Sequence, residues 1–196
     1  MPKRILLIIG HPDSDPGRFC RALAKAYEAG ARQGGHEVRV VDVAALEFPL
    51  LRSTSEFNAG SVPGGLKSAS ESILWAQHIV FIFPLWLGTM PALLKAFLEQ
   101  VARPGIAFAY PDKGGNGFKA ALHGRSARII VTMGMPGFIY RLFYLGHGIA
   151  GMRRNILNFV GIKPVWETLF GMVESVSDAK RKSWIEDVRQ LGAQGR

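Results

Sequence analysis

The chain has 196 residues, of which 48 % are hydrophobic and 20 % are charged, and its formal net charge is +9. This length and composition fit a single globular domain over residues 1–196 and exclude a disordered chain. The positive charge favours anionic partners, but the basic runs are short and none is interleaved with aromatic residues, so we expect no nucleic-acid partner.

The lone cysteine, Cys20, excludes an internal disulfide, and His and Cys show no metal-site spacing, so we expect no bound metal. A chain with so little cysteine fits a reducing compartment, which predicts a cytoplasmic location. The apolar run after Lys3 is too short for a signal peptide, and the apolar stretch 137–152 contains Arg141 and is too short to cross a bilayer. We therefore expect a protein that is not embedded in a membrane.

Short apolar segments alternate with helical patterns from the N-terminus onward. Residues 3–9 read KRILLII, which predicts a buried strand, and apolar residues then recur at helical spacing over 18–34. Residues 37–43 are rich in β-branched side chains and predict a second strand. Next in order we expect a Ser-, Gly- and Pro-rich loop at 49–65, a helix at 66–76 and a third strand at 78–83.

The second half of the chain continues this alternation. A helix is predicted at 91–101, with Pro in its first turn, and an irregular excursion at 105–125 contains the sequence GGNG at 114–117. The remaining predictions, in chain order, are a strand at 127–132, a helix at 155–160, a strand at 164–170 and a closing helix at 178–191. Five apolar strands separated by helices predict a parallel α/β sheet with helices on both faces, for which the strand order 2-1-3-4-5 is one of few options.

In such a sheet, ligands bind beyond the carboxyl ends of the strands, so the loops after the first, third and fourth strands are the candidate site. The first loop, GHPDSDPG, offers His11, Ser14 and Arg18 as phosphate donors at a helix start. It matches neither the dinucleotide fingerprint nor the P-loop motif. On pattern alone, simple capping of the helix by Asp13, Ser14 or Asp15 is slightly favoured.

The other two loops hold features with two interpretations each. Trp86, in the sequence PLWLGTMP, suits either a planar aromatic ligand or the protein core, and the ligand is slightly favoured. The turn TMGMPG at 132–137 permits close approach to a ligand but is equally an ordinary turn. His147 lies between two glycines. It is either a catalytic proton donor or an ordinary histidine of a loop. For Cys20, a packed and inert thiol is favoured over a reactive one.

Taken together, these loops resemble a known family. The sequence FPLWLGTMPALLKAFLEQV, followed by GIAFAY, is similar to the signature of the NAD(P)H:quinone oxidoreductase family with flavodoxin-like fold. The first loop, GHPDSDPGRFCRAL, and the turn VTMGMPG resemble that family's equivalents, and RNILNFVGIK matches a helix-to-strand segment. The resemblance implies a flavodoxin-like, doubly wound five-stranded sheet of order 2-1-3-4-5.

The same resemblance implies a bound flavin, FMN or FAD, that passes a hydride from NAD(P)H to a quinone-like acceptor. It implies a homodimer with the active site at the subunit interface, and Tyr140 and His147 as a catalytic pair. The cofactor-binding residues it implies are His11, Ser14, Arg18, Phe19 and Cys20 around the phosphates, and Pro84, Leu85, Trp86, Leu87, Thr132, Met133, Gly134 and Met135 around the ring.

Three departures from the family pattern stand out. Cys20 replaces the usual Asn, the first loop is about two residues longer, and Met133 and Met135 replace small or polar residues, which predicts a more apolar pocket. Relatives of this size also serve as ancillary subunits of potassium-efflux systems, so a regulatory flavin-binding subunit is the alternative function. An electron-transfer flavodoxin is less well supported, because those proteins are usually acidic.

Overall fold

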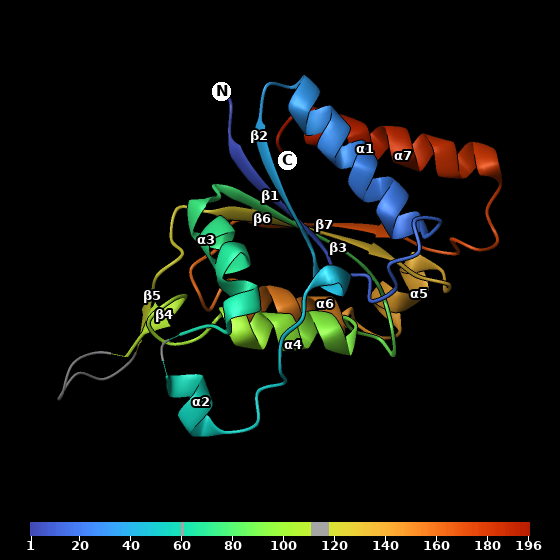
Figure 1. Cartoon of the computed structure of the whole chain (residues 1–196). Helices are drawn as coiled ribbons and strands as arrows, with labels where there is room; N and C mark the ends of the chain where they lie inside the picture. The colour runs from blue at the N-terminus through green and yellow to red at the C-terminus, as the bar shows by residue number, and fades with distance from the viewer. Residues whose placement is uncertain (60, 111–117) are drawn as a thin grey trace.

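The computed structural model describes residues 1–59, 61–110 and 118–196, which form a three-layer α/β structure (Figure 1). The central sheet has five parallel strands in the order β2-β1-β3-β6-β7. The strands are β1 (Arg4–Ile9), β2 (Glu37–Asp42), β3 (His78–Pro84), β6 (Ser126–Thr132) and β7 (Val165–Phe170). The predicted fold class and the order 2-1-3-4-5 are therefore confirmed. β1 and β3 are buried nearly throughout, as apolar strands between two helical layers require.

Helices cover both faces of the sheet. On one face lie α1 (Phe19–Gln33) and α7 (Asp178–Ala193), side by side at the top of Figure 1. They pack so closely that a Cβ atom on Gly30 would collide with the carbonyl oxygen of Arg189, and one on Gly192 with that of Tyr27. The opposite layer contains α3 (Lys67–Trp75), α4 (Ala92–Val101), α6 (His147–Gly151) and the π-helical turn η3 (Met152–Leu157).

Two segments that we predicted as irregular contain short elements. The loop at 49–65 holds α2 (Thr54–Asn58), because the Ser53 hydroxyl caps it by accepting a hydrogen bond from the Glu56 amide at 3.1 Å. Single 3₁₀ turns occur at Val43–Ala45 and Gly64–Leu66. In the excursion at 105–125, β4 (Phe108–Ala109) pairs antiparallel with β5 (Lys119–Ala120). The GGNG sequence at 114–117 lies outside the described residues.

The segment between β6 and β7 is more helical than predicted. It contains α5 (Gly137–Leu142), and the helical run that we placed at 155–160 instead begins at His147 and ends at Leu157. Gly146 adopts a left-handed conformation with φ of 59° and separates the two helices. Within the described part of the chain, no helix is long and apolar enough to cross a membrane.

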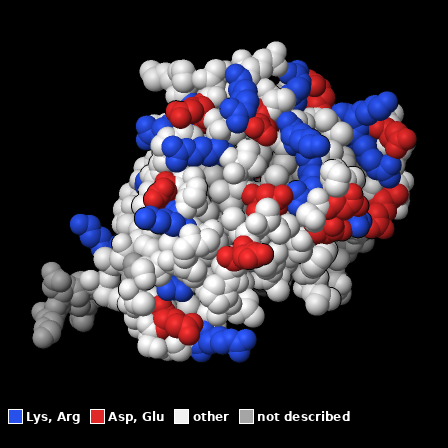
Figure 2. All heavy atoms as spheres, in the orientation of Figure 1, with Lys and Arg blue, Asp and Glu red and all other residues white. Residues whose placement is uncertain are grey.

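Charged side chains are mixed over the visible surface. On the face shown in Figure 2, Lys and Arg alternate with Asp and Glu, and no single basic stripe crosses it. Some charged side chains form local ion pairs along helices, such as Arg32 with Glu28 and Arg189 with Glu186. The net charge of +9 is therefore not gathered into one groove on this face.

Candidate functional site

The loops after β1, β3 and β6 meet at the carboxyl edge of the sheet, as predicted. The Gly10 amide donates a hydrogen bond to the Ile82 carbonyl at 2.8 Å, which joins the first loop to β3. The Leu85 amide donates to the Thr132 carbonyl, also at 2.8 Å, which joins the third loop to β6. The strand order reverses between β1 and β3, so the site lies where open α/β sheets bind ligands.

The first loop leaves the start of α1 uncapped. Arg18 precedes the helix, and no side chain accepts from its first amides, so the prediction that Asp13, Ser14 or Asp15 caps α1 is wrong. The two carboxylates instead accept from loop amides: Asp13 from Asp15 at 2.8 Å and Asp15 from Gly17 at 2.9 Å. These hydrogen bonds keep the two carboxylates within the loop and away from the first amides of α1.

Two amides at this helix start remain available. Those of Phe19 and Cys20 donate no hydrogen bond within the described part of the chain, and the first turn of α1 has no acidic residue. The positive end of the helix dipole therefore faces the carboxyl edge with two free donors, which is an arrangement suited to an anion.

An ion-pair network fixes the shape of the first loop. Arg21, which is buried, binds Asp42 at the end of β2 through two hydrogen bonds of 2.6 and 3.2 Å, and its Nε donates to the Asp13 carbonyl at 3.0 Å. The exposed Arg18 pairs with the Asp13 carboxylate at 2.6 Å. Arg18 thus stands at the helix start as predicted, with its guanidinium held by a carboxylate of the same loop.

His11 is buried beside the turn after β3. Its Nδ1 accepts a hydrogen bond from the Asp13 amide at 3.0 Å, and burial lowers the pKa of the imidazole, so the neutral ring carries its proton on Nε2. The ring lies edge-on to Trp86, with centroids 6.1 Å apart. His11 is therefore a fixed donor at the site, whereas Ser14 is exposed.

Cys20 is packed in the protein core, as predicted. Its Sγ lies 3.1 Å from the Thr132 hydroxyl, and burial raises the pKa of the thiol to about 11. The contact joins the first turn of α1 to the end of β6. Because both side chains are turned into this contact, only the backbone of Cys20 and Thr132 is free to face a ligand.

The turn after β3 projects from the sheet edge. Trp86 is half exposed, so the interpretation of this residue as core is wrong, and Leu87 is fully exposed with a left-handed φ of 47°. Trp86 and Thr89 exchange two backbone hydrogen bonds of 2.9 and 3.0 Å, which close the turn. Pro84, the last residue of β3, and Leu85 are partly buried beneath it. The turn thus holds an indole ring at the strand end without burying it.

The turn after β6 presents backbone rather than side chains. Met133 is buried in the core, and its amide donates to the Phe170 carbonyl at 2.9 Å. Met135 is partly buried against the same core. The amides of Gly134 and Met135 donate no hydrogen bond among the residues that the structure describes. They supply two further donors at the carboxyl edge.

The structure brings Tyr140 and His147 to one hollow of about 380 Å³, shared with Leu87, Thr89 and Tyr144. The Tyr140 side chain is buried; its hydroxyl donates to the Gly88 carbonyl and accepts from the Ile149 amide, both at 3.1 Å. Burial raises the pKa of this phenol. His147 is exposed at the start of α6.

The approach of α6 to the turn after β3 depends on a small residue. A Cβ on Gly148 would collide with the Gly88 carbonyl oxygen. Sequence reasoning did not identify Thr89, Tyr144 or Gly148 as site residues. The Gly-His-Gly pattern was the available signal for Gly148, because glycine permits close packing of backbones.

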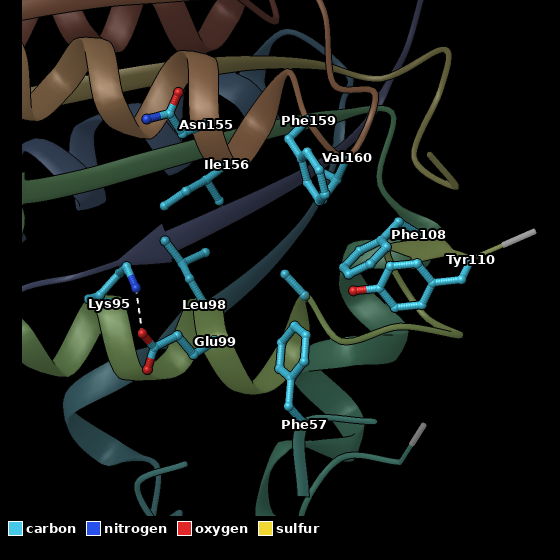
Figure 3. A pocket seen from close by; sticks show the side chains of 11 residues that line it. Phe57, Lys95, Leu98, Glu99, Phe108, Tyr110, Asn155, Ile156, Phe159 and Val160 are labelled. Atoms are coloured by element: carbon cyan, nitrogen blue, oxygen red, sulfur yellow. Dashed lines mark hydrogen bonds and ion pairs between the residues drawn. The ribbon is translucent and has the colours of Figure 1, made fainter. Parts of the chain in front are cut away.

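A second cavity, of about 270 Å³, lies between α4 and η3 (Figure 3). Leu98 and Phe57 point into it from one side and Ile156 and Phe159 from the other, and Lys95 pairs with Glu99 at its edge. A hollow of about 410 Å³ that shares Lys95, Asn155 and Ile156 with this cavity also includes Thr89 and His147. An apolar groove therefore continues from the sheet edge along α4. We did not predict it, since Phe57 and Phe108 come from segments without periodicity.

Comparisons with known proteins agree with this geometry. Residues 3–192 match the family model described as flavodoxin-like fold. An uncharacterized NAD(P)H oxidoreductase of Haemophilus influenzae is 30% identical over 185 residues, which cover 92% of this chain and 90% of that protein. An FMN-dependent NADH:quinone oxidoreductase of Macrococcus caseolyticus is 25% identical, with 98% of each chain covered.

A solved structure shows the same arrangement of elements. Smu.1420 from Streptococcus mutans superposes with a TM-score of 0.82 at 26% identity, and the match covers 97% of this chain and 99% of that one. The resemblance inferred from the three loops is confirmed: the chain belongs to the NAD(P)H:quinone oxidoreductase family with flavodoxin-like fold.

Proposed function

We propose that the chain is an FMN-dependent oxidoreductase that uses NAD(P)H to reduce quinone-like acceptors in two-electron steps. The observation that carries the proposal is the uncapped start of α1, which offers the Phe19 and Cys20 amides beside the exposed indole of Trp86. A helix start suits a phosphate group, which FMN and FAD both carry. The Macrococcus relative is named as FMN-dependent, which favours FMN over FAD.

The phosphate would be held at α1 by several donors. Besides the two amides, His11 offers its Nε2–H and Ser14 its hydroxyl. Arg18 would contribute by exchanging the Asp13 carboxylate for the phosphate, since both anions suit the same guanidinium.

The flavin ring would lie between the turns after β3 and β6. When bound, flavin supplies the hydride chemistry, and the protein supplies position and electrostatics. Trp86 and the backbone from Pro84 to Leu87 would position the ring, and the Gly134 and Met135 amides would stabilise negative charge on it. The site as a whole thus combines one anion-binding end with one planar, partly apolar end.

His147 and Tyr140 would contact the quinone-like acceptor. His147 is exposed at the mouth of the hollow, where it can hand a proton to an acceptor oxygen. The Tyr140 hydroxyl holds the Gly88 carbonyl and α6 in place and forms part of the wall that the acceptor would touch.

The first test identifies the cofactor. We expect the purified protein to show flavin absorbance, to release FMN on denaturation, and to reduce a soluble quinone with NAD(P)H. Arg18→Gln should weaken FMN binding about tenfold or more, because it removes a charge-assisted hydrogen bond. Arg32→Gln, at the other end of α1, is the matched control. Protein that stays colourless after FMN is added and reduces no quinone would contradict the proposal.

The second test concerns the acceptor. His147→Gln should lower kcat about a hundredfold while leaving FMN affinity unchanged, because a general acid acts in the reaction and not in cofactor binding. Measurement of kcat across pH, with a separate FMN titration, distinguishes the two effects. An unchanged kcat would remove His147 from the mechanism.

We also propose a homodimer and a cytoplasmic location. The apolar groove along α4 supports a second copy as its cover, because such a groove is unfavourable in water. Light scattering of the eluted protein should give twice the monomer mass, and a monomer would contradict this.

The cytoplasmic location rests on the lone cysteine. The alternative of an ancillary subunit of a potassium-efflux system stays a prediction that rests on the net charge.

A further inference from the structure

A buried arginine with an unused binding edge lies near the amino end of β6. Arg128 exposes only 8% of its surface. Ile130, two residues further along the same side of the strand, packs in one core with Leu23 of α1, so Arg128 faces the helical layer of α1 and α7. Four residues separate Arg128 from Thr132 at the carboxyl edge, which is about 13 Å along a strand. The surroundings of Arg128 are therefore distinct from the site described above.

The guanidinium of Arg128 uses only one of its three nitrogens. Nη1 donates to the Thr168 hydroxyl at 2.7 Å, whereas Nε is buried without a partner and Nη2 forms no hydrogen bond in the described chain. The N–H bonds of Nε and Nη2 point the same way and form the edge by which arginine binds two oxygens of one anion. Arg189 uses this edge, since its Nε and Nη2 each lie 2.7 Å from an oxygen of Glu186. In Arg128 the same edge is open.

Arg128 also lacks a counter-ion. Among the residues that the structure describes, no carboxylate lies within ion-pair distance of it. Glu167, which precedes Thr168 on β7, faces the opposite side of the sheet and pairs with Arg153 at 2.8 Å. Burial lowers the pKa of the Arg128 guanidinium, as expected where its charge is poorly solvated. A buried cation is costly unless an anion accompanies it, so this position favours the binding of an anion.

A second unpaired group lies close by. His78, on the neighbouring strand β3, is fully buried, and its Nε2 has no hydrogen-bond partner within the described residues. The centroid of its ring lies 6.0 Å from that of Trp166, and the guanidinium carbon of Arg128 lies 5.8 Å from the same indole centroid. Both unpaired groups thus adjoin one indole ring. Because Trp166 is 39% exposed, this cluster lies just beneath the surface.

We propose that Arg128 forms the centre of an oxyanion site, in which its open edge binds the carboxylate or phosphate group of a small solute. Trp166 and His78 would form the walls of this site. The planar edge selects an anion that presents two oxygens, so a spherical anion such as chloride should bind more weakly. The proposal does not depend on a bound flavin, because no residue of this cluster belongs to the loops at the carboxyl edge.

Nuclear magnetic resonance of the arginine Nε–H signals tests the site in the full chain. The Arg128 signal is assigned by its loss in Arg128→Lys. We expect it to shift and saturate on titration with sodium acetate or inorganic phosphate, with an affinity at least tenfold higher than for sodium chloride at equal ionic strength. The stronger of the two oxyanions identifies the class of ligand. The Arg189 signal should not move, because Glu186 already occupies that edge.

Variants separate this site from other cations. Arg128→Gln should weaken the stabilisation of the fold by the same anions about tenfold or more, measured as the shift of the thermal midpoint with anion concentration. Arg39→Gln is the matched control, because Arg39 is also a strand arginine beside a tryptophan, 4.2 Å from the ring centroid of Trp75. Arg18→Gln alters the proposed FMN site and should leave the shift of the Arg128 signal unchanged.

Three results would overturn the proposal. The first is an Arg128 signal that does not saturate with either oxyanion, or that responds equally to chloride. The second is an anion dependence that Arg39→Gln weakens as much as Arg128→Gln does. The third is a response of the Arg128 signal that disappears in Arg18→Gln, because that result would place the anion at α1. The titration of the unchanged protein stands even where Arg128→Gln folds poorly.

Discussion

His78, the first residue of β3, is a buried histidine on the side of the sheet away from the site. Its Nδ1 lies 2.8 Å from the Ser126 hydroxyl, and its ring contacts Trp166. Within the described residues, its Nε2 has no hydrogen-bond partner. Burial, with smaller contributions from the nearby cations Lys3 and Arg128, lowers the pKa of His78 to about 3. The folded protein therefore holds this ring neutral.

This pKa predicts a loss of stability in acid. Between pH values of about 6.5 and 3 the unfolded chain binds a proton at His78 that the folded chain does not. The free energy of unfolding should therefore decrease as the pH is lowered, by about 1.4 kcal/mol per pH unit for this one proton. Urea unfolding at pH 7, 6 and 5 measures the slope. The slope of the free energy of unfolding against pH should be smaller by about this amount in His78→Gln. In His147→Gln, which changes an exposed histidine, the slope should stay the same. Equal slopes for all three proteins would contradict the assignment.

Single residues of the site differ in how far the sequence predicts them. The exposure of Trp86 and the packing of Cys20 follow from local context, because both lie next to a strand or helix end. The ion pair between Arg21 and Asp42 does not, since it depends on the register of β1 with β2, which places Ile9 beside Asp42. The engagement of Arg18 by Asp13 likewise depends on the loop conformation.

At the scale of elements, glycines set the closest contact between helices. Gly30 on α1 and Gly192 on α7 each face backbone atoms of the other helix. Two helices that touch through backbone leave no space for a methyl group. This contact fixes the position of α1, and with it the amides of Phe19 and Cys20 at the sheet edge.

Gly30→Ala should destabilise the protein. Alanine favours an isolated helix by about 0.5–1 kcal/mol, but overpacking against the Arg189 carbonyl should give a net loss of about 1–3 kcal/mol. Gly151→Ala on α6 is the matched control, because nothing lies within 4 Å of the added atom, and it should be neutral or stabilising. Urea unfolding followed by circular dichroism measures both. A neutral Gly30→Ala would show that α1 and α7 can separate freely.

The five strands were predictable as elements, and the helices between β6 and β7 were not. Buried strands read as continuous aliphatic runs, which few other structures produce. By contrast, α5 exposes Phe138 and Leu142, so it lacks the polar face by which a surface helix is recognised. The pair β4–β5 is only two residues long in each strand, which is too short for any periodic pattern.

At the scale of the whole molecule, ligand binding and folding are coupled. A ligand that binds only the folded state stabilises it by about 2.7 kcal/mol at a hundred times its Kd. For a chain of this size the proposed FMN should therefore raise Tm by about 5–10 °C. Riboflavin, which lacks the phosphate, is the matched control and should raise Tm less, because it leaves the α1 amides unpaired. Thermal unfolding with each compound measures this, and equal shifts would contradict a phosphate at α1.

The position of α7 in the chain has a consequence for synthesis. It follows every strand of the sheet, yet Val188 on α7 packs in the same core as Ile5 and Leu7 of β1. At roughly 5–20 residues per second, the ribosome takes on the order of ten seconds or more to proceed from β1 to α7. During that interval the aliphatic side chains of β1 are not yet covered by α7. The nascent chain would therefore expose an apolar strand to chaperones until translation of α7 is complete.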